Sequence, residues 1–128
     1  MGTYVAKKIL VVDDDVSIAD LLTQALLEEG YDVHKSVQSL RVYDAVREYQ
    51  PDLVLLDLMM PYLEGEDELQ LMKLSPDTAS IPVIVVTAKA EADLRKEEAN
   101  LRQLGVVHII TKPIDLDAVV KLVKQTVG

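Results

Sequence analysis

The chain has 128 residues, of which 49% are hydrophobic, so it is long enough to bury a core and too apolar to be disordered. Its formal charge of −9 disfavours nonspecific attraction to nucleic-acid phosphates, and the absence of Trp and Phe removes the usual platform for stacking bases. Cysteine is absent, which excludes thiol chemistry, and no apolar run approaches the roughly 20 residues of a membrane span.

The N-terminal residues carry lysines but no signal-peptide pattern, because acidic residues begin at Asp13, soon after the first apolar run. We therefore expect a single domain over residues 1–128, with its core at about 8–127, in a cytoplasmic setting. No membrane contact and no direct nucleic-acid contact are expected.

Short apolar runs alternate with amphipathic segments along the chain, which is typical of βα units and a parallel sheet. Five such runs predict strands at about 8–12, 32–36, 53–57, 83–87 and 107–111. Helices are predicted from about Ile18 to before Gly30, from a cap at Ser39 through Tyr49, around Leu69 and Met72, from Glu91 to Leu104, and from a cap at Asp115 through Val127. Right-handed crossovers then place helices on both faces of a doubly wound α/β sheet.

Several of the predicted strands run directly into polar side chains. Asp13 and Asp14 follow the first strand, and Asp57 ends the third. Thr87 ends the fourth strand, and Lys112 follows the fifth. Because the carboxyl ends of parallel strands meet at one edge of a sheet, we expect these side chains to converge there.

The acidic residues predict a metal site at this edge. Three carboxylates held close together repel one another by roughly several kcal/mol at an intermediate dielectric unless a cation or proton intervenes. Oxygen-only ligands suit a hard divalent ion, and Mg²⁺ typically takes one or two carboxylates with waters and phosphate oxygens. Taken without Asp57, the acidic run 13–15 fits equally well a solvated loop whose charges favour the N-terminus of the next helix.

Lys112 and Thr87 complete a set of groups suited to phosphoryl transfer. The ammonium group can pair with a carboxylate or with phosphoryl oxygens, and the hydroxyl can donate to an oxyanion. Asp57 is then the candidate nucleophile. A surface lysine in a turn and an ordinary strand threonine are the alternatives, and the Lys112–Pro113 bond can be cis or trans.

Four ordered motifs resemble the receiver domain of two-component response regulators over about residues 8–127. They are Val-Val-Asp-Asp-Asp at 11–15, Pro-Asp-Leu-Val-Leu-Leu-Asp-Leu-Met-Met-Pro at 51–61 with Gly65, Pro-Val-Ile-Val-Val-Thr-Ala at 82–88, and Thr-Lys-Pro at 111–113. The resemblance implies a flavodoxin-like five-stranded parallel sheet of order 2-1-3-4-5 with five helices.

The resemblance also implies a role for each candidate residue. Asp57 matches the phosphoacceptor, and Asp13 and Asp14 match the acidic pair that organises Mg²⁺. Met59 matches the position whose backbone carbonyl ligates the metal. Thr87 matches the switch hydroxyl, and Lys112 matches the lysine of the site. The implied partner is a histidine kinase or phosphotransfer protein, with an unknown output partner and a homodimer left open. Such a domain is a phosphoacceptor that assists its own phosphorylation and dephosphorylation, and not an enzyme acting on other substrates.

Two features depart from the pattern of that family. Many receivers carry Tyr or Phe three residues before the lysine, where this chain has Ile109. The segment 89–103 is also a few residues longer than usual. Isoleucine can respond by packing but offers no ring or phenol as a switching element, so the resemblance does not establish how Asp57 is coupled to the surface.

Two other functions remain open from the sequence. One is a pseudo-receiver that acts as a protein-interaction module without phosphorylation, and the other is a flavodoxin-like FMN carrier. The second is disfavoured because acids, instead of a Ser/Thr/Gly-rich phosphate loop, follow the first strand. We expect either a stand-alone regulator or an excised receiver.

Overall fold

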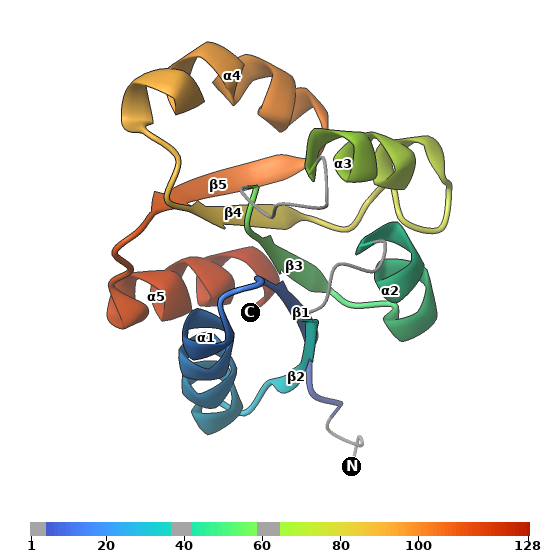
Figure 1. The fold of residues 1–128 in the computed structure, drawn as a ribbon. Coiled ribbons are helices and arrows are strands. Elements are labelled where there is room, and N and C mark those ends of the chain that lie inside the picture. The colour runs from blue at the N-terminus through green and yellow to red at the C-terminus, as the bar shows by residue number, and fades with distance from the viewer. Residues whose placement is uncertain (1–4, 37–41, 59–64) are drawn as a thin grey trace.

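The protein is described by a computed structural model over residues 5–36, 42–58 and 65–128 (Figure 1). Its centre is a five-stranded parallel sheet of order β2-β1-β3-β4-β5. The strands are β1 (Lys8–Val12), β2 (Asp32–Ser36), β3 (Leu53–Leu56), β4 (Val83–Thr87) and β5 (Val106–Thr111). The helices are α1 (Val16–Glu28), α2 (Val42–Tyr49), α3 (Gly65–Leu74), α4 (Glu91–Gln103) and α5 (Leu116–Val127). The fold class, element types and strand order predicted from the sequence are confirmed.

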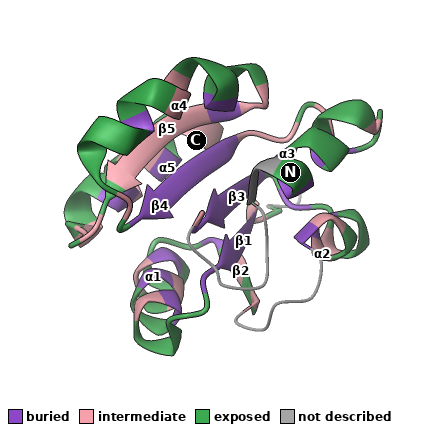
Figure 2. Cartoon of the chain, turned by 45° about the horizontal axis from the view of Figure 1, so that its top comes forward, coloured by how far each residue is buried: buried purple, intermediate pink, exposed green. Residues whose placement is uncertain are grey.

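The sheet separates two apolar layers, because alternate strand residues point to opposite faces. On one face, strand residues such as Ile9 and Leu55 pack with α1 and α5. On the other, residues such as Leu10 and Leu56 pack with α2, α3 and the end of α4. The central strands are buried on both sides, whereas the outer surfaces of the helices are exposed (Figure 2). This explains why those strands are almost continuously apolar.

Aspartate caps fix the start of two helices. Asp15 Oδ1 accepts hydrogen bonds from Ser17 N and Ile18 N at the start of α1. Asp115 does the same at α5, as the sequence predicted. Gly30 follows the C-cap of α1 with φ +91°, a conformation that favours glycine.

The ends of several elements differ slightly from the predicted ends. β3 stops at Leu56, one residue before Asp57, and β5 begins one residue earlier, at Val106. α4 ends at Gln103, and Leu104 serves as its C-cap. The predicted cap Ser39 and the predicted ligand Met59 lie outside the described residues. Within the described parts of the chain, no helix has the length and apolar character needed to cross a bilayer.

Candidate functional site

Asp13 and Asp57 lie next to each other because β1 and β3 are neighbours in register. Val12 pairs with Leu56, so the residue after each strand faces the residue after the other. A hydrogen bond of 3.0 Å from Asp57 N to Val12 O continues the pairing past the end of β3. Both side chains are nearly inaccessible to water, with Asp13 2% and Asp57 5% exposed. The fold thus places two carboxylates side by side below the surface.

Lys112 brings a positive charge from the end of β5, the outermost strand on one side of the sheet. Its Nζ lies 3.0 Å from Asp57 Oδ2 and 2.8 Å from Asp13 Oδ2. Its backbone N–H donates to Thr87 O over 2.8 Å, which attaches the residue to the end of β4. The Lys112–Pro113 peptide bond is cis. The lysine is therefore part of the acidic group and not a free side chain on a turn.

Asp14 completes a cluster of three carboxylates. One oxygen from each of Asp13, Asp14 and Asp57 lies within 4.8 Å of the others. Asp14 is exposed, so the cluster opens to solvent on one side. Asp13 Oδ1 accepts a hydrogen bond of 2.9 Å from Asp15 N, which orients this carboxylate. Asp13 Oδ2 is buried and, although close to Lys112 Nζ, has no well-aligned hydrogen bond.

The charges of the cluster influence one another strongly. Burial raises the pKa of Asp13, and the charge of Asp57 adds to this effect, while Lys112 and the Asp15 N–H oppose it. Burial acts to lower the pKa of Lys112, but its contacts with Asp13 and Asp57 outweigh burial and raise the pKa. The lysine is therefore held in its charged form between the two carboxylates.

The donor set fits a hard divalent cation. All the side-chain atoms of the cluster that could ligate a metal are carboxylate oxygens. One of them, Asp13 Oδ2, is buried and accepts no well-aligned hydrogen bond. The exposed side of the cluster leaves room for water or a ligand oxygen. Three carboxylates facing one ammonium also leave a net negative charge that a cation would offset. Asp13, Asp14 and Asp57 are the described side chains that could hold such an ion.

Thr87 lies at the same edge, at the end of β4, and is completely buried. Its Oγ1 accepts a hydrogen bond of 3.2 Å from Lys89 N. By strand alternation, Thr87 follows Val83 and Val85, which pack on the α2–α3–α4 face. Thr87 thus connects the acidic edge with the segment leading into α4.

Two residues with a part in this arrangement were not identified from the sequence. Asp15 was grouped with the acidic run, and its place immediately before the helical pattern was the available signal for a cap. Lys89 was assigned to a charged helix face, and no sequence signal revealed its contact with Thr87. The histidines lie apart from the cluster: His34 stacks near Tyr49 with ring centroids 5.2 Å apart, and His108 lies within β5.

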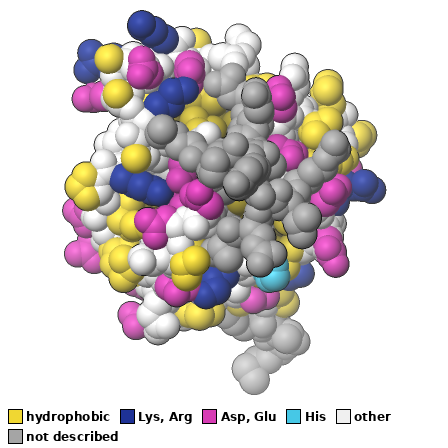
Figure 3. Space-filling model, viewed as in Figure 1, with side chains coloured by type: hydrophobic (Ala, Val, Ile, Leu, Met, Phe, Trp, Pro, Cys, Tyr) yellow, Lys and Arg dark blue, Asp and Glu magenta, His cyan; other side chains and the backbone are white. Residues whose placement is uncertain are grey.

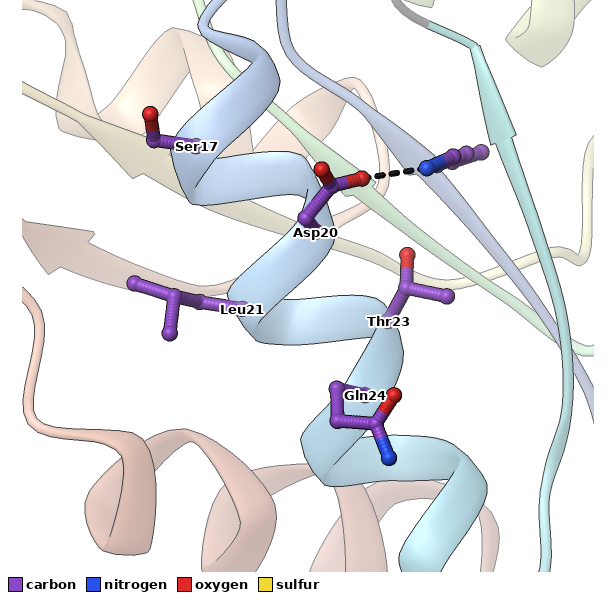
Figure 4. Close-up of a pocket in the computed structure, with 6 residues that line it drawn as sticks. Ser17, Asp20, Leu21, Thr23 and Gln24 are labelled. Carbon is purple, nitrogen blue, oxygen red and sulfur yellow. Dashed lines mark hydrogen bonds and ion pairs between the residues drawn. The ribbon is translucent and has the colours of Figure 1, made fainter.

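A surface depression lies away from the acidic site. A depression of about 560 Å³ follows α1 and is lined by Ser17, Asp20, Leu21, Thr23, Gln24 and Lys35 (Figure 4). An ion pair between Lys35 and Asp20 crosses it, and none of the cluster residues lines it. On the face in Figure 3, Lys and Arg side chains are scattered among acidic ones and form no continuous basic surface over the coloured residues.

Comparisons with known proteins find matches that extend over nearly the whole chain. The family model for the response regulator receiver domain matches residues 9–124. The chain is 36% identical over 119 residues to sporulation initiation phosphotransferase F of Bacillus subtilis, covering 93% of this chain and 92% of that protein. It is 32% identical over 117 residues to the DNA-binding dual master transcriptional regulator RpaA of Synechocystis sp., covering 91% of this chain but 47% of RpaA.

A solved structure has the same architecture over nearly the whole chain. It is a CheY-like response regulator receiver domain protein from Methanospirillum hungatei, with a TM-score of 0.81 and 28% sequence identity. The match covers 96% of this chain and 94% of that protein.

Proposed function

This chain belongs to the response regulator receiver domain family, and from that membership we propose that Asp57 is the residue that accepts the phosphoryl group. The family consists of signalling domains of two-component systems that are phosphorylated on aspartate in a phosphorelay. The observation that carries the assignment is the position of Lys112 Nζ, 3.0 Å from Asp57 and 2.8 Å from Asp13. Among the described aspartates, Asp13 shares this burial, the ammonium group and the neighbouring carboxylates, and the match of residues 51–61 to the family motif favours Asp57 as the acceptor.

In the proposed reaction, an ionised carboxylate oxygen of Asp57 attacks the phosphorus of the donor. A phosphorus–oxygen bond forms as the bond between phosphorus and the donor atom breaks, and the donor leaves with that electron pair and takes up a proton. The product is an aspartyl phosphate. Lys112 balances negative charge on the transferred oxygens, and the Thr87 hydroxyl donates to one of them.

We infer that the reaction requires Mg²⁺. Asp13, Asp14 and Asp57 would hold the ion, with the backbone carbonyl of Met59 as a further proposed ligand. When bound, the ion supplies positive charge that offsets the charge of the transferred group. The hydrogen bond from Asp15 N orients Asp13 Oδ1, and Asp13 Oδ2 faces Lys112 Nζ.

The proposed donor is a histidine kinase or phosphotransfer protein of the cytoplasm, and the output is a shift in conformation read by another protein. We treat residues 8–127 as one receiver-like unit that assists its own phosphorylation and dephosphorylation. RpaA is named as a DNA-binding regulator, but this chain covers 47% of its length. The net charge of −9 further supports a protein, and not DNA, as the direct partner of these residues.

Acetyl phosphate treatment with and without Mg²⁺ tests the assignment. We expect mass spectrometry to find one acid-labile phosphate on Asp57, formed only with the metal. Asp57→Asn should abolish it, whereas Asp52→Asn, a matched change at the other end of β3, should retain it. Phosphate on a different residue would disprove the assignment, and complete absence of labelling would favour the pseudo-receiver function.

A further inference from the structure

The two outer strands of the sheet, β2 and β5, differ in how well they discourage pairing with another chain. Each has a neighbouring strand on one side only, so one row of its backbone groups faces away from the sheet. Proteins commonly protect such an edge with charged side chains, and β2 carries Asp32 and Lys35. β5 has the sequence Val-Val-His-Ile-Ile-Thr and carries no acidic residue, lysine or arginine. Its own side chains thus leave the outer edge of β5 open to strand pairing.

The pairing of β5 with β4 shows which backbone groups of β5 face outward. Lys112 N donates to Thr87 O over 2.8 Å, so the backbone N–H of Lys112 faces β4. The backbone groups of successive strand residues point to opposite sides, so those of Thr111 and Ile109 point away from β4. An additional strand would form its hydrogen bonds with these groups.

A side chain of α4 already reaches the start of this strand. Arg102 Nη1 donates to Val107 O over 3.2 Å, while its Nε and Nη2 donate to Glu98 Oε1 over 3.2 and 3.0 Å. The guanidinium group therefore supplies Val107 with a donor from outside the sheet. This contact confines the open part of the edge to the C-terminal half of β5, from Ile109 to Thr111.

A depression of about 250 Å³ lies between α4 and this half of β5, which run alongside each other (Figure 1). It is lined by Glu91, Leu94, Arg95, Glu98, Ile109 and Thr111. Leu94 is buried and Ile109 is half-buried, so part of the lining is apolar. The Ile109 side chain packs on the α4 side of the sheet, and a residue opposite it in an added strand would point to the same side. An apolar side chain at that position would enter the depression.

The charges around the depression favour a basic partner. Glu91 and Glu98 line it together with Arg95, and the whole chain carries a formal charge of −9. The Glu91–Arg95 pair is long, at 3.6 Å, and both side chains are more than three-quarters exposed. Water and salt screen such a pair strongly, so a lysine from a partner can compete for the carboxylate.

The spacing of these acids fits a strand with two lysines. Glu91 and Glu98 are seven residues apart on α4, which is roughly 10 Å along the helix. Lysines four residues apart in an extended segment point to the same side and are roughly 13 Å apart. An apolar residue midway between the two lysines then lies on the same side as both. A segment of this pattern places one apolar side chain at the depression and a lysine toward each acid.

We propose that the edge of β5 from Ile109 to Thr111 binds an extended segment of a partner protein as a sixth strand, with an apolar side chain in the depression and lysines beside Glu91 and Glu98. Backbone hydrogen bonds supply affinity in this mode of recognition, and the depression supplies selectivity. The pairing needs no phosphoryl group on Asp57, so it stands apart from the proposed function.

The test uses the capped peptide Thr-Lys-Thr-Val-Thr-Lys-Thr and the full chain labelled with ¹⁵N. Amide signals are followed by NMR as the peptide is added. Two N-methylated forms of the peptide serve as a matched pair, one methylated at the lysines and valine and the other at the threonines. Because the N–H groups of alternate residues point to opposite sides, only one of these two sets can face β5. The comparison leaves the protein itself unchanged, so folding does not affect it.

We expect the unmodified peptide to shift the amide signals of Ile109 and Thr111 and to leave those of β2 in place. One methylated form should bind about tenfold more weakly, and the other should bind like the unmodified peptide. Thr111→Pro removes an outward N–H group and should weaken binding about fivefold. Val33→Pro is its matched control because Asp32 N donates to Lys7 O, which places the Val33 N–H on the outer edge of β2. This control should retain the wild-type affinity.

Several results would overturn the proposal. Equal affinities for all three peptides would show charge attraction without strand pairing. Shifts centred on β2 or on the acidic cluster, or no binding at about 1 mM peptide, would remove β5 as the binding edge. Signals of Ile109 and Thr111 that move with protein concentration before peptide is added would make a second copy of the chain the occupant. Each of these results leaves the phosphate labelling of Asp57 to be decided by its own experiment.

Discussion

At Lys112, one ammonium group faces two carboxylates that are almost completely shielded from water. Neither carboxylate can gain full hydration in the folded chain, so each depends on this neighbour for charge balance. Removal of the lysine would leave like charges facing each other across a short distance. The residue thus contributes to stability as well as to the proposed chemistry.

We therefore predict that Lys112→Met lowers the free energy of unfolding by about 1–3 kcal/mol in the absence of divalent cations. Urea denaturation measures this difference. Lys124→Met is the matched control, because Lys124 Nζ lies 2.8 Å from Glu29 on the open surface. That change should leave the urea midpoint unaltered within error. Equal losses in the two variants would contradict a special role for the Lys112 contacts.

Tyr49 offers a test of electrostatics away from the acidic edge. Burial, followed by the nearby Asp32, raises the pKa of its phenol to about 12. Its hydroxyl donates to Asp32 O over 3.2 Å, which also favours the neutral form. Because the folded chain keeps this proton longer than the unfolded chain, the contribution of Tyr49 to stability is complete below pH 10 and is lost as the pH rises through about 12.

Absorbance titration of the phenolate should accordingly show a component from Tyr49 that ionises later than an ordinary phenol, and Tyr49→Phe should remove that component. Over the same range, the free energy of unfolding should fall more steeply with pH in the wild type than in Tyr49→Phe. A late component that survives in Tyr49→Phe would assign it to another tyrosine.

Helices α1 and α5 both begin with an aspartate N-cap, but the two caps have different surroundings. Asp15 Oδ1 and Asp115 Oδ1 each accept two backbone hydrogen bonds, at 3.0 and 3.3 Å. Only Asp15 also donates its backbone N–H to Asp13 Oδ1. The start of α1 is therefore tied to the position of a carboxylate in the acidic cluster.

This difference leads to a paired prediction. Asp15→Ala and Asp115→Ala should each lower the free energy of unfolding by about 1 kcal/mol, the usual cost of losing an N-cap. Only Asp15→Ala should also weaken Mg²⁺ binding in calorimetry, because fraying of α1 releases Asp13. Equal Mg²⁺ affinities in the two variants would show that the cap does not position the cluster.

The sequence was sufficient to predict the elements because their patterns are local. The run from Lys8 to Val12 is apolar enough to identify a strand buried on both faces, and strand direction alone places Asp13 and Asp57 at one edge. The contacts of Lys89 could not be predicted in this way. They depend on the path of the connection before α4 and on a side-chain rotamer, neither of which follows from periodicity.

For the molecule as a whole, the excess of acidic residues makes stability sensitive to cations in two ways. General screening of the −9 charge stabilises the compact chain with any salt, whereas a specific site responds to a divalent ion at low concentration. The clustered carboxylates of Asp13, Asp14 and Asp57 fall in the second category. These two effects can be separated by matching ionic strength.

We predict that Mg²⁺ at ten times its dissociation constant raises the free energy of unfolding by about 1.4 kcal/mol, because it binds the folded chain alone. NaCl at equal ionic strength should produce a smaller gain, and Asp14→Asn should reduce the Mg²⁺ effect while keeping the NaCl effect. Thermal unfolding monitored by circular dichroism measures all three. Identical curves with the two salts would contradict a specific site.

The division of the apolar interior into two layers has a consequence for redesign. Among the described residues, the layer under α1 and α5 and the layer under α2, α3 and α4 have no side chain in common. Mutations selected to give the α4 side a new binding specificity would therefore leave the packing beneath Asp57 untouched.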